Sequence, residues 1–137
     1  MIFLDTNVVS EPLRKRPDDA VMEWLGRFDA ELALSTVALA EVSFGIEKIR
    51  RQERARRLEA GLEELRRRFT GRLFGFTEDA ALAYGTIMGR AWLEGRRMST
   101  ADGMIAAIVK VNGGRLATRN LAHFETTGLD LISPWEF

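Results

Sequence analysis

Short, continuous apolar runs alternate with longer segments in which apolar residues recur every three or four positions. A short continuous run indicates a buried strand, and the longer spacing indicates an amphipathic helix. The predicted strands are 2–4, 32–35, 73–76, 115–118 and 129–133. The predicted helical segments are a short turn within 7–13 and helices over 18–28, 36–49, 53–69, 78–94 and 99–111. Strands that alternate with helices favour a mainly parallel sheet between two helical layers, a three-layer α/β/α sandwich.

The length and composition favour a single domain that spans residues 1–137. Apolar residues make up 46% of the chain, which is enough to form a sizeable core. The chain has no cysteine and only one histidine, His123, which excludes disulfide scaffolds, thiol nucleophiles and zinc sites built from Cys or from several His residues. The first apolar run stops at Asp5, too early for a signal peptide or a membrane span. We therefore expect a cytoplasmic protein that does not enter a membrane.

Three carboxylates occupy positions where local structure alone does not readily account for an acidic side chain. Asp5 directly follows the first strand, Glu41 is the only charge within an apolar helical stretch, and Asp102 lies in the first turn of the last predicted helix. Each also has a plain structural interpretation. Asp5 is typical of a cap for the next turn, Glu41 of a surface residue, and Asp102 of a capping box with Ser99.

The three acids share one predicted location, the edge of the sheet where the strands end. Ligands of open parallel sheets bind at this edge. Carboxylates that converge there repel one another and raise their own pKa values, and a hard cation with oxygen ligands, Mg²⁺ or Mn²⁺, removes that conflict. Asn120 follows the strand 115–118 at the same edge, although it is also typical of a polar turn.

The charge is balanced over the whole chain but not along it. The 20 Lys and Arg residues equal the 20 Asp and Glu residues, yet residues 48–72 hold ten basic and four acidic side chains, a net charge of +6. A basic segment of this kind suits a phosphate backbone or an acidic partner. The alternative is a solvated helix face with pairs four residues apart, such as Glu53–Arg57 and Glu63–Arg67. Both interpretations stay open at this stage.

Four sequence blocks in this order resemble a PIN domain, and among PIN domains the VapC/FitB branch of toxin ribonucleases. The blocks are Ile2-Phe-Leu-Asp5-Thr6-Asn7, Ala40-Glu41-Val-Ser-Phe-Gly45-Ile46, Ala101-Asp102-Gly-Met-Ile-Ala-Ala107 and Ala117-Thr118-Arg119-Asn120. The ending Ile132-Ser133-Pro134-Trp135 is similar to the usual ending of that branch. The resemblance covers essentially the whole chain.

The resemblance implies an α/β/α domain with endoribonuclease activity that depends on Mg²⁺ or Mn²⁺. It places the metal ligands at Asp5, Glu41 and Asp102 and a further catalytic position at Asn120, where the family usually carries a fourth acid. This chain departs from the family pattern there, because an asparagine offers only a neutral carbonyl oxygen. We therefore expect one firmly held ion, with any second ion arriving together with RNA. His123, one turn further on, is expected to assist this site or to be a plain surface residue.

Further residues acquire expected roles by the same resemblance. Thr6, Asn7 and Thr118 are expected to support the acids. Arg50, Arg51 and Arg54 are candidates for contact with RNA or with a cognate antitoxin. The family also implies homodimers and hetero-oligomers of toxin and antitoxin.

Two alternatives from other functional classes remain. A PIN-fold module in which Asn120 marks a weakened site would bind antitoxin or RNA without cleavage. A phosphotransferase with Asp5 as nucleophile requires a second Asp two residues later, where this chain has Asn7.

Overall fold

The computed structural model describes residues 1–137 and places five strands in one parallel sheet of order β3-β2-β1-β4-β5. The strands are β1 (Ile2–Leu4), β2 (Leu32–Ser35), β3 (Leu73–Phe74), β4 (Arg115–Ala117) and β5 (Leu131–Ile132). The all-parallel pairing confirms the sheet predicted from the pattern. The outermost strands β3 and β5 are shorter than predicted, because a strand at the edge of a sheet has a pairing partner on one side only.

The helices follow the predicted periodicity closely. The α-helices are α1 (Thr6–Val9), α2 (Asp19–Arg27), α3 (Thr36–Lys48), α4 (Ala55–Arg68), α5 (Glu78–Leu93) and α6 (Thr100–Val111). Shorter 3₁₀ segments are η1 (Glu11–Leu13), η2 (Asp29–Glu31) and η3 (Leu121–Thr127), of which η2 and η3 were not predicted. The hydroxyl or carboxylate of the cap residue accepts a backbone N–H at the start of several helices, including Asp18 before α2 and Ser99 before α6.

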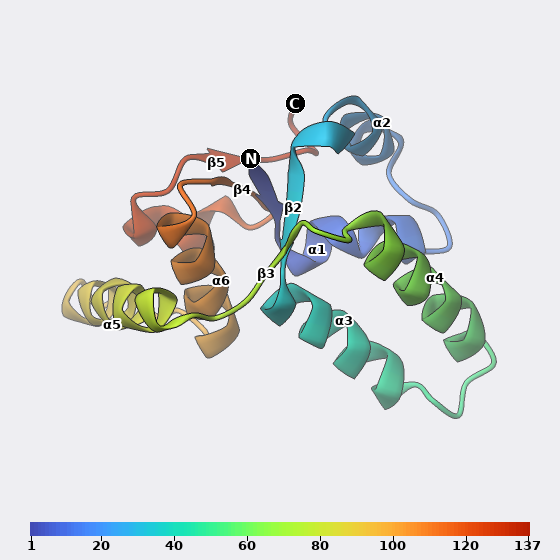
Figure 1. The fold of residues 1–137 in the computed structure, drawn as a ribbon, viewed down its shortest axis with the longest axis horizontal. Coiled ribbons are helices and arrows are strands. Elements are labelled where there is room, and N and C mark those ends of the chain that lie inside the picture. The colour runs from blue at the N-terminus through green and yellow to red at the C-terminus, as the bar shows by residue number, and fades with distance from the viewer.

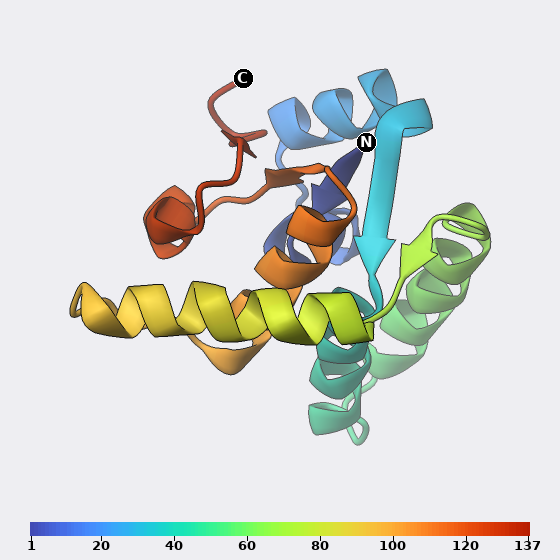
Figure 2. The ribbon, with the colours of Figure 1, turned by 60° about the vertical axis from the view of Figure 1, so that its left-hand side comes forward.

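Helices cover both faces of the sheet (Figures 1 and 2). Helix α6 packs against the sheet on one side and carries α5 on its outer surface, whereas α2 and α4 lie on the other side. The helices α3 and α4 form a hairpin, and α3 extends beyond the carboxyl end of β2 to contact α1 and α6. This arrangement leaves the carboxyl edge of the central strands flanked by the N-terminal ends of α1, α3 and α6.

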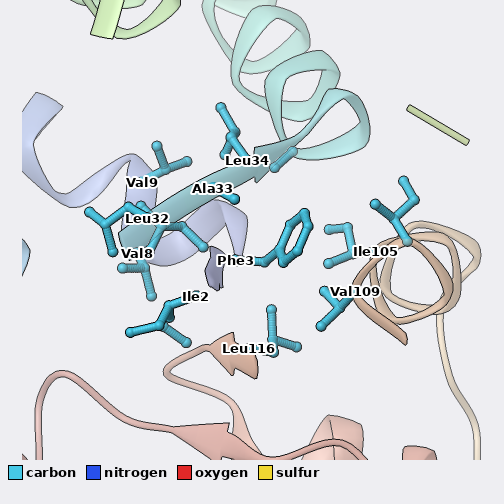
Figure 3. Close-up of a cluster of buried hydrophobic side chains, with 14 of the residues drawn as sticks. Ile2, Phe3, Val8, Val9, Leu32, Ala33, Leu34, Ile105, Val109 and Leu116 are labelled. Carbon is cyan, nitrogen blue, oxygen red and sulfur yellow. The ribbon is translucent and has the colours of Figure 1, made fainter. Parts of the chain in front are cut away.

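The core is built around the central strand β1. Phe3 is fully buried, and its ring packs edge-on against Phe74 at a centroid distance of 5.3 Å. Figure 3 shows Phe3 directed toward Ile105 and Val109 of α6, whereas Ile2 lies toward Val8 of α1. The backbone at Gly114 approaches this ring so closely that an added Cβ atom would lie 2.7 Å from it. Alternating sides of one short strand therefore anchor both helical layers.

None of the helices has both the length and the apolar character that crossing a lipid bilayer requires.

Candidate active site

Asp5 is held at the carboxyl end of β1 by hydrogen bonds to both of its carboxylate oxygens. Its Oδ1 accepts the Thr6 N–H at 2.8 Å, and its Oδ2 accepts the hydroxyl of Thr118 at 2.7 Å. Its own N–H donates to the carbonyl of Ala117, which continues the pairing of β1 with β4. Asp5 is also the N-cap of α1, so its structural role and its place at the candidate site coexist.

The surroundings of Asp5 disfavour its negative charge. The residue is only 5% exposed, and desolvation by burial is the main cause that raises the pKa of its carboxyl above the usual 3.8. The bonds from Thr118 and Thr6 act in the opposite direction and lower this pKa, whereas the charges of Asp102 and Glu41 raise it further. The structure thus brings the three predicted acids near enough for two of them to act on the third.

Glu41 and Asp102 approach this point from two helices. Glu41, half-buried on α3, accepts a hydrogen bond from the Thr6 hydroxyl, so Thr6 bonds to Asp5 through its backbone and to Glu41 through its side chain. Asp102 lies in the first turn of α6, where its N–H donates to Ser99 Oγ at 3.1 Å, which is one of the two bonds of the predicted capping box. The Asp102 carboxylate is not used by that cap, and its side chain is 21% exposed.

The residues expected to support the acids, and Asn120 beside them in the sequence, make different contacts. Thr118 also accepts the Asn120 N–H at 3.0 Å, which fixes the start of η3 beside Asp5. The Asn120 side chain makes no cap bond and the residue is exposed. The side-chain oxygen of Asn7 accepts the N–H of Arg119 at 3.3 Å, and the Arg119 guanidinium lies 4.9 Å from the ring centroid of Trp135.

His123 lies beside one of the three acids, Asp102, although the two residues are 21 positions apart in the sequence. It is on η3, and its Nδ1 is 3.6 Å from Asp102 Oδ2, with a side chain that is 60% exposed. Because η3 was not predicted, the sequence pattern gave no signal that His123 faces the first turn of α6. His123 is thus a surface residue that lies beside a candidate ligand, and its assistance to the site stays a prediction.

The donor chemistry at this edge suits a hard divalent cation. Asp5, Glu41 and Asp102 offer only oxygen atoms, and a cation would relieve the repulsion that raises the Asp5 pKa. No group of three or more Asp, Glu or His side chains is arranged so that it could hold a metal ion by itself. Asp5, Glu41 and Asp102 offer suitable donor atoms but do not form a ready-made metal site.

A large groove opens beside Thr6 and Glu41. Its volume is about 930 Å³, and η1, the following loop, α3 and α4 line it. It contains five cationic side chains, which are Arg14, Lys15, Arg16, Arg54 and Arg57. We call it the basic groove. The acidic residue that lines it is Glu41, so one of the candidate ligands faces a strongly basic surface.

The arginines predicted to contact RNA or antitoxin do not all face this groove. Arg54 lines it, whereas Arg50 and Arg51 line a separate polar hollow. Arg50 is engaged with Glu47 and Glu59 at 2.9 and 2.8 Å. Three cations of the groove, Arg14, Lys15 and Arg16, were not predicted, because they lie outside the basic segment 48–72.

The ion pairs on α4 differ from the predicted ones. The side chains pair three residues apart, Glu63 with Arg66 and Glu64 with Arg67, rather than four apart. Arg57, predicted to pair with Glu53, instead donates to the carbonyl oxygen of Leu13 at 2.8 Å. A tertiary acceptor for Arg57 thus replaces the local carboxylate, and α4 is joined to η1.

Known proteins are similar to this chain in sequence and in fold over nearly its full length. The family model described as PIN domain matches residues 2–128. The chain is 39% identical over 138 residues to "VapC ribonuclease Y4jK" of Sinorhizobium fredii, with 99% of each chain covered. It is 35% identical over 137 residues to "Toxin FitB" of Neisseria gonorrhoeae, covering 98% of this chain and 99% of FitB.

Solved structures agree with the sequence matches. The crystal structure of FitAcB from Neisseria gonorrhoeae superposes with a TM-score of 0.92 at 34% sequence identity, and the alignment covers 100% of both chains. The parallel sheet, the acids at its carboxyl edge and the matches over the full length all lead to the same assignment. The chain belongs to the PIN domain family.

Proposed function

We propose that this chain is a metal-dependent endoribonuclease that acts as the toxin of a toxin–antitoxin pair. The observation that carries the proposal is the buried Asp5, whose carboxylate is oriented by Thr6 and Thr118 and lies under the influence of two further acids. Relatives named as a VapC ribonuclease and a toxin support the activity and its biological role.

In this proposal Asp5, Glu41 and Asp102 hold Mg²⁺ or Mn²⁺. When bound, the ion supplies a lowered pKa for the attacking water and offsets the negative charge that develops on the phosphate. Asn120 adds a neutral amide beside the acids, without the charge of a fourth carboxylate. The proposed site therefore holds one ion firmly, with any second ion arriving together with RNA.

The remaining residues of the site orient these ligands. Thr118 and the Thr6 backbone fix the Asp5 carboxylate by one bond to each oxygen, so its direction does not depend on the ion. The Thr6 hydroxyl fixes Glu41 in the same way. Asn7 holds the backbone at Arg119, next to Asn120. Such partners of metal ligands set ligand geometry and contribute to affinity for the ion.

We further propose a cognate antitoxin as the protein partner and a homodimer as the assembly of the toxin. The structural relative FitAcB and a second one, described as FitAB bound to IR36 DNA fragment, support the complex with an antitoxin. In this proposal residues 1–137 form a single PIN domain that carries the site in each protomer.

The decisive experiment compares RNA cleavage by the purified chain and by Asp5→Asn, with Asp19→Asn as a matched exposed control. We expect cleavage that requires Mg²⁺ or Mn²⁺, is abolished by chelation, is lost in Asp5→Asn and is retained in Asp19→Asn. Equal cleavage by all three proteins would show that the site lies elsewhere. Binding of RNA without any cleavage or metal binding would instead establish the non-catalytic module.

A further inference from the structure

The loop between η1 and α2 presents three consecutive exposed cations. Arg14, Lys15 and Arg16 stand between Pro12 and Pro17, and all three line the basic groove. Beyond the bond from the Arg14 N–H to the Glu11 carbonyl, the loop has no regular secondary structure. A loop without regular structure contributes little to phosphate binding unless other contacts fix it, because its ordering would cost conformational entropy on binding.

A buried acid fixes this loop at both ends. Glu11 is only 2% exposed, and its Oε2 accepts the N–H of Asp18 at 2.8 Å, where the loop ends. Its Oε1 lies 3.1 Å from Nη1 of Arg14, where the loop begins. Burial of an unpaired carboxylate is costly, so Glu11 holds the loop ends in the positions that satisfy it. Glu11 has no place in the chemistry proposed above.

The opposite part of the basic groove is joined to the same region. Arg57 of α4 donates to the carbonyl of Leu13 at 2.8 Å, and Arg54 precedes α4 at the groove. Gly61 of α4 lies so close to Leu13 that an added Cβ atom would be 2.3 Å from its Cδ2. The spacing between α4 and η1 is thus fixed by two contacts at Leu13.

The charge and position of the groove indicate its occupant. Five cations line it against a single carboxylate, Glu41, which is itself a candidate metal ligand. An extended polyanion that runs along these cations would reach Glu41 and Thr6, and through Thr6 the carboxylate of Asp5. A phosphate backbone has this charge, and arginine binds phosphate oxygens in a bidentate manner.

We propose that Glu11 is a positioning residue that holds the Arg14–Arg16 loop as one wall of an RNA backbone groove, with Arg54 contributing from α4. This inference rests on the proposed ribonuclease function. It identifies the loop before α2, together with Arg54, as the surface that delivers the phosphate backbone to the acids. It also gives the buried Glu11 a role through the loop rather than at the scissile phosphate.

The first test measures binding of a labelled single-stranded RNA to the Asp5→Asn protein, which separates binding from cleavage. Fluorescence anisotropy over a range of salt concentrations compares Lys15→Gln/Arg16→Gln with Arg90→Gln/Lys110→Gln. The second pair removes the same charge from α5 and α6, away from the groove. We expect the slope of log affinity against log salt to shrink by about 1.4 for the loop variant, because each lost contact to a single strand removes about 0.7. The control should keep the parent slope.

The second test addresses Glu11 itself. In the active chain we expect Glu11→Gln to raise KM for RNA while kcat at saturating RNA is retained, and in the Asp5→Asn protein we expect it to reduce the salt slope. Its effect should be smaller when Lys15→Gln/Arg16→Gln is already present, because Glu11 acts through that loop. A loss of thermal stability with an unchanged salt slope would overturn the proposal and leave Glu11 as a purely structural residue.

The outcomes separate this inference from the proposed function. If the Asp5→Asn protein itself shows no salt-dependent RNA binding, both proposals fail. If it binds RNA but the loop and control variants are indistinguishable, only the groove assignment is overturned. If the loop variant binds RNA normally and no longer co-purifies with a co-expressed antitoxin, the groove serves a protein and the assignment is likewise overturned.

Discussion

The hydroxyl of Thr118 donates a 2.7 Å hydrogen bond to Oδ2 of Asp5 across 113 positions of sequence. The two residues follow the neighbouring parallel strands β4 and β1, so their side chains emerge at the same edge of the sheet. Both side chains are buried, and the Asp5 pKa is lowered by this bond against the stronger effect of desolvation. Loss of this bond should therefore affect both the stability of the fold and the orientation of the Asp5 carboxylate.

Replacing Thr118 by valine keeps the volume and removes the hydroxyl. The buried Oδ2 of Asp5 then loses its partner, and we expect the free energy of unfolding to fall by about 1–3 kcal/mol. Urea denaturation measures this difference. Thr86→Val is the control, because the Thr86 hydroxyl is exposed and bonds only within α5. Equal stability of Thr118→Val and the parent would mean that the bond contributes nothing in solution.

Stability should depend on pH through Asp5. Because its pKa is raised in the folded protein, folding favours the protonated form, and this contribution is lost as the pH rises through the folded pKa. In the presence of a chelator, we therefore expect Asp5→Asn to be more stable than the parent at pH 7. This advantage should shrink as the pH falls through the raised folded pKa and should be gone at about pH 4 and below. Thermal unfolding at several pH values measures it. An advantage that is the same at pH 3 and pH 7 would contradict the assignment.

Added Mg²⁺ or Mn²⁺ should stabilise the parent protein. Binding to the folded state at ten times Kd adds about 1.4 kcal/mol to the free energy of unfolding. Asp5→Asn and Asp102→Asn should show a much smaller increase, whereas Asp19→Asn should behave like the parent. Thermal shift measurements at increasing ion concentration provide the comparison. An identical shift in all four proteins would indicate nonspecific ion binding.

The hydroxyl of Thr6 should matter more for catalysis than for folding. Thr6→Val leaves the backbone bond to Asp5 and removes the bond to Glu41, so we expect activity or metal affinity to fall by roughly 10–100-fold. Thr6→Ser retains a hydroxyl and should restore most of the activity. Steady-state cleavage at several Mg²⁺ concentrations distinguishes the two variants. Loss of activity in Thr6→Ser to the same degree would point to packing of the methyl group instead.

Two helical glycines offer a matched test of the contact between α4 and η1. At Gly85 on α5 an added Cβ atom meets nothing within 4 Å, so Gly85→Ala should gain about 0.5–1 kcal/mol from helix propensity. At Gly61 the same atom meets Leu13 at 2.3 Å, so Gly61→Ala should be the less stable of the two. Chemical denaturation measures both. A similar gain at Gly61 would show that Leu13 moves aside freely.

The chain pattern predicted most of the elements because helices and buried strands carry local periodic signals. The acids were also visible in the sequence, since Asp5 follows a strand, Glu41 is the only charge in an apolar helical stretch and Asp102 follows its cap Ser99. The segment η3 escaped prediction because it has neither a strong apolar period nor a side-chain cap. For the same reason the contact of His123 with Asp102 was not foreseen as a specific pair.

The sequence by itself determined the alternation of strands and helices and the chemical identity of the acids, because both depend on residues that are close along the chain. Only the tertiary structure decided which side chains meet. The bonds from Thr118 to Asp5 and from Thr6 to Glu41 depend on the order of the strands and the packing of α3. The basic groove likewise joins the Arg14–Arg16 loop to Arg54, which are distant in sequence. Such contacts are set by sheet order and helix packing, which no local pattern specifies.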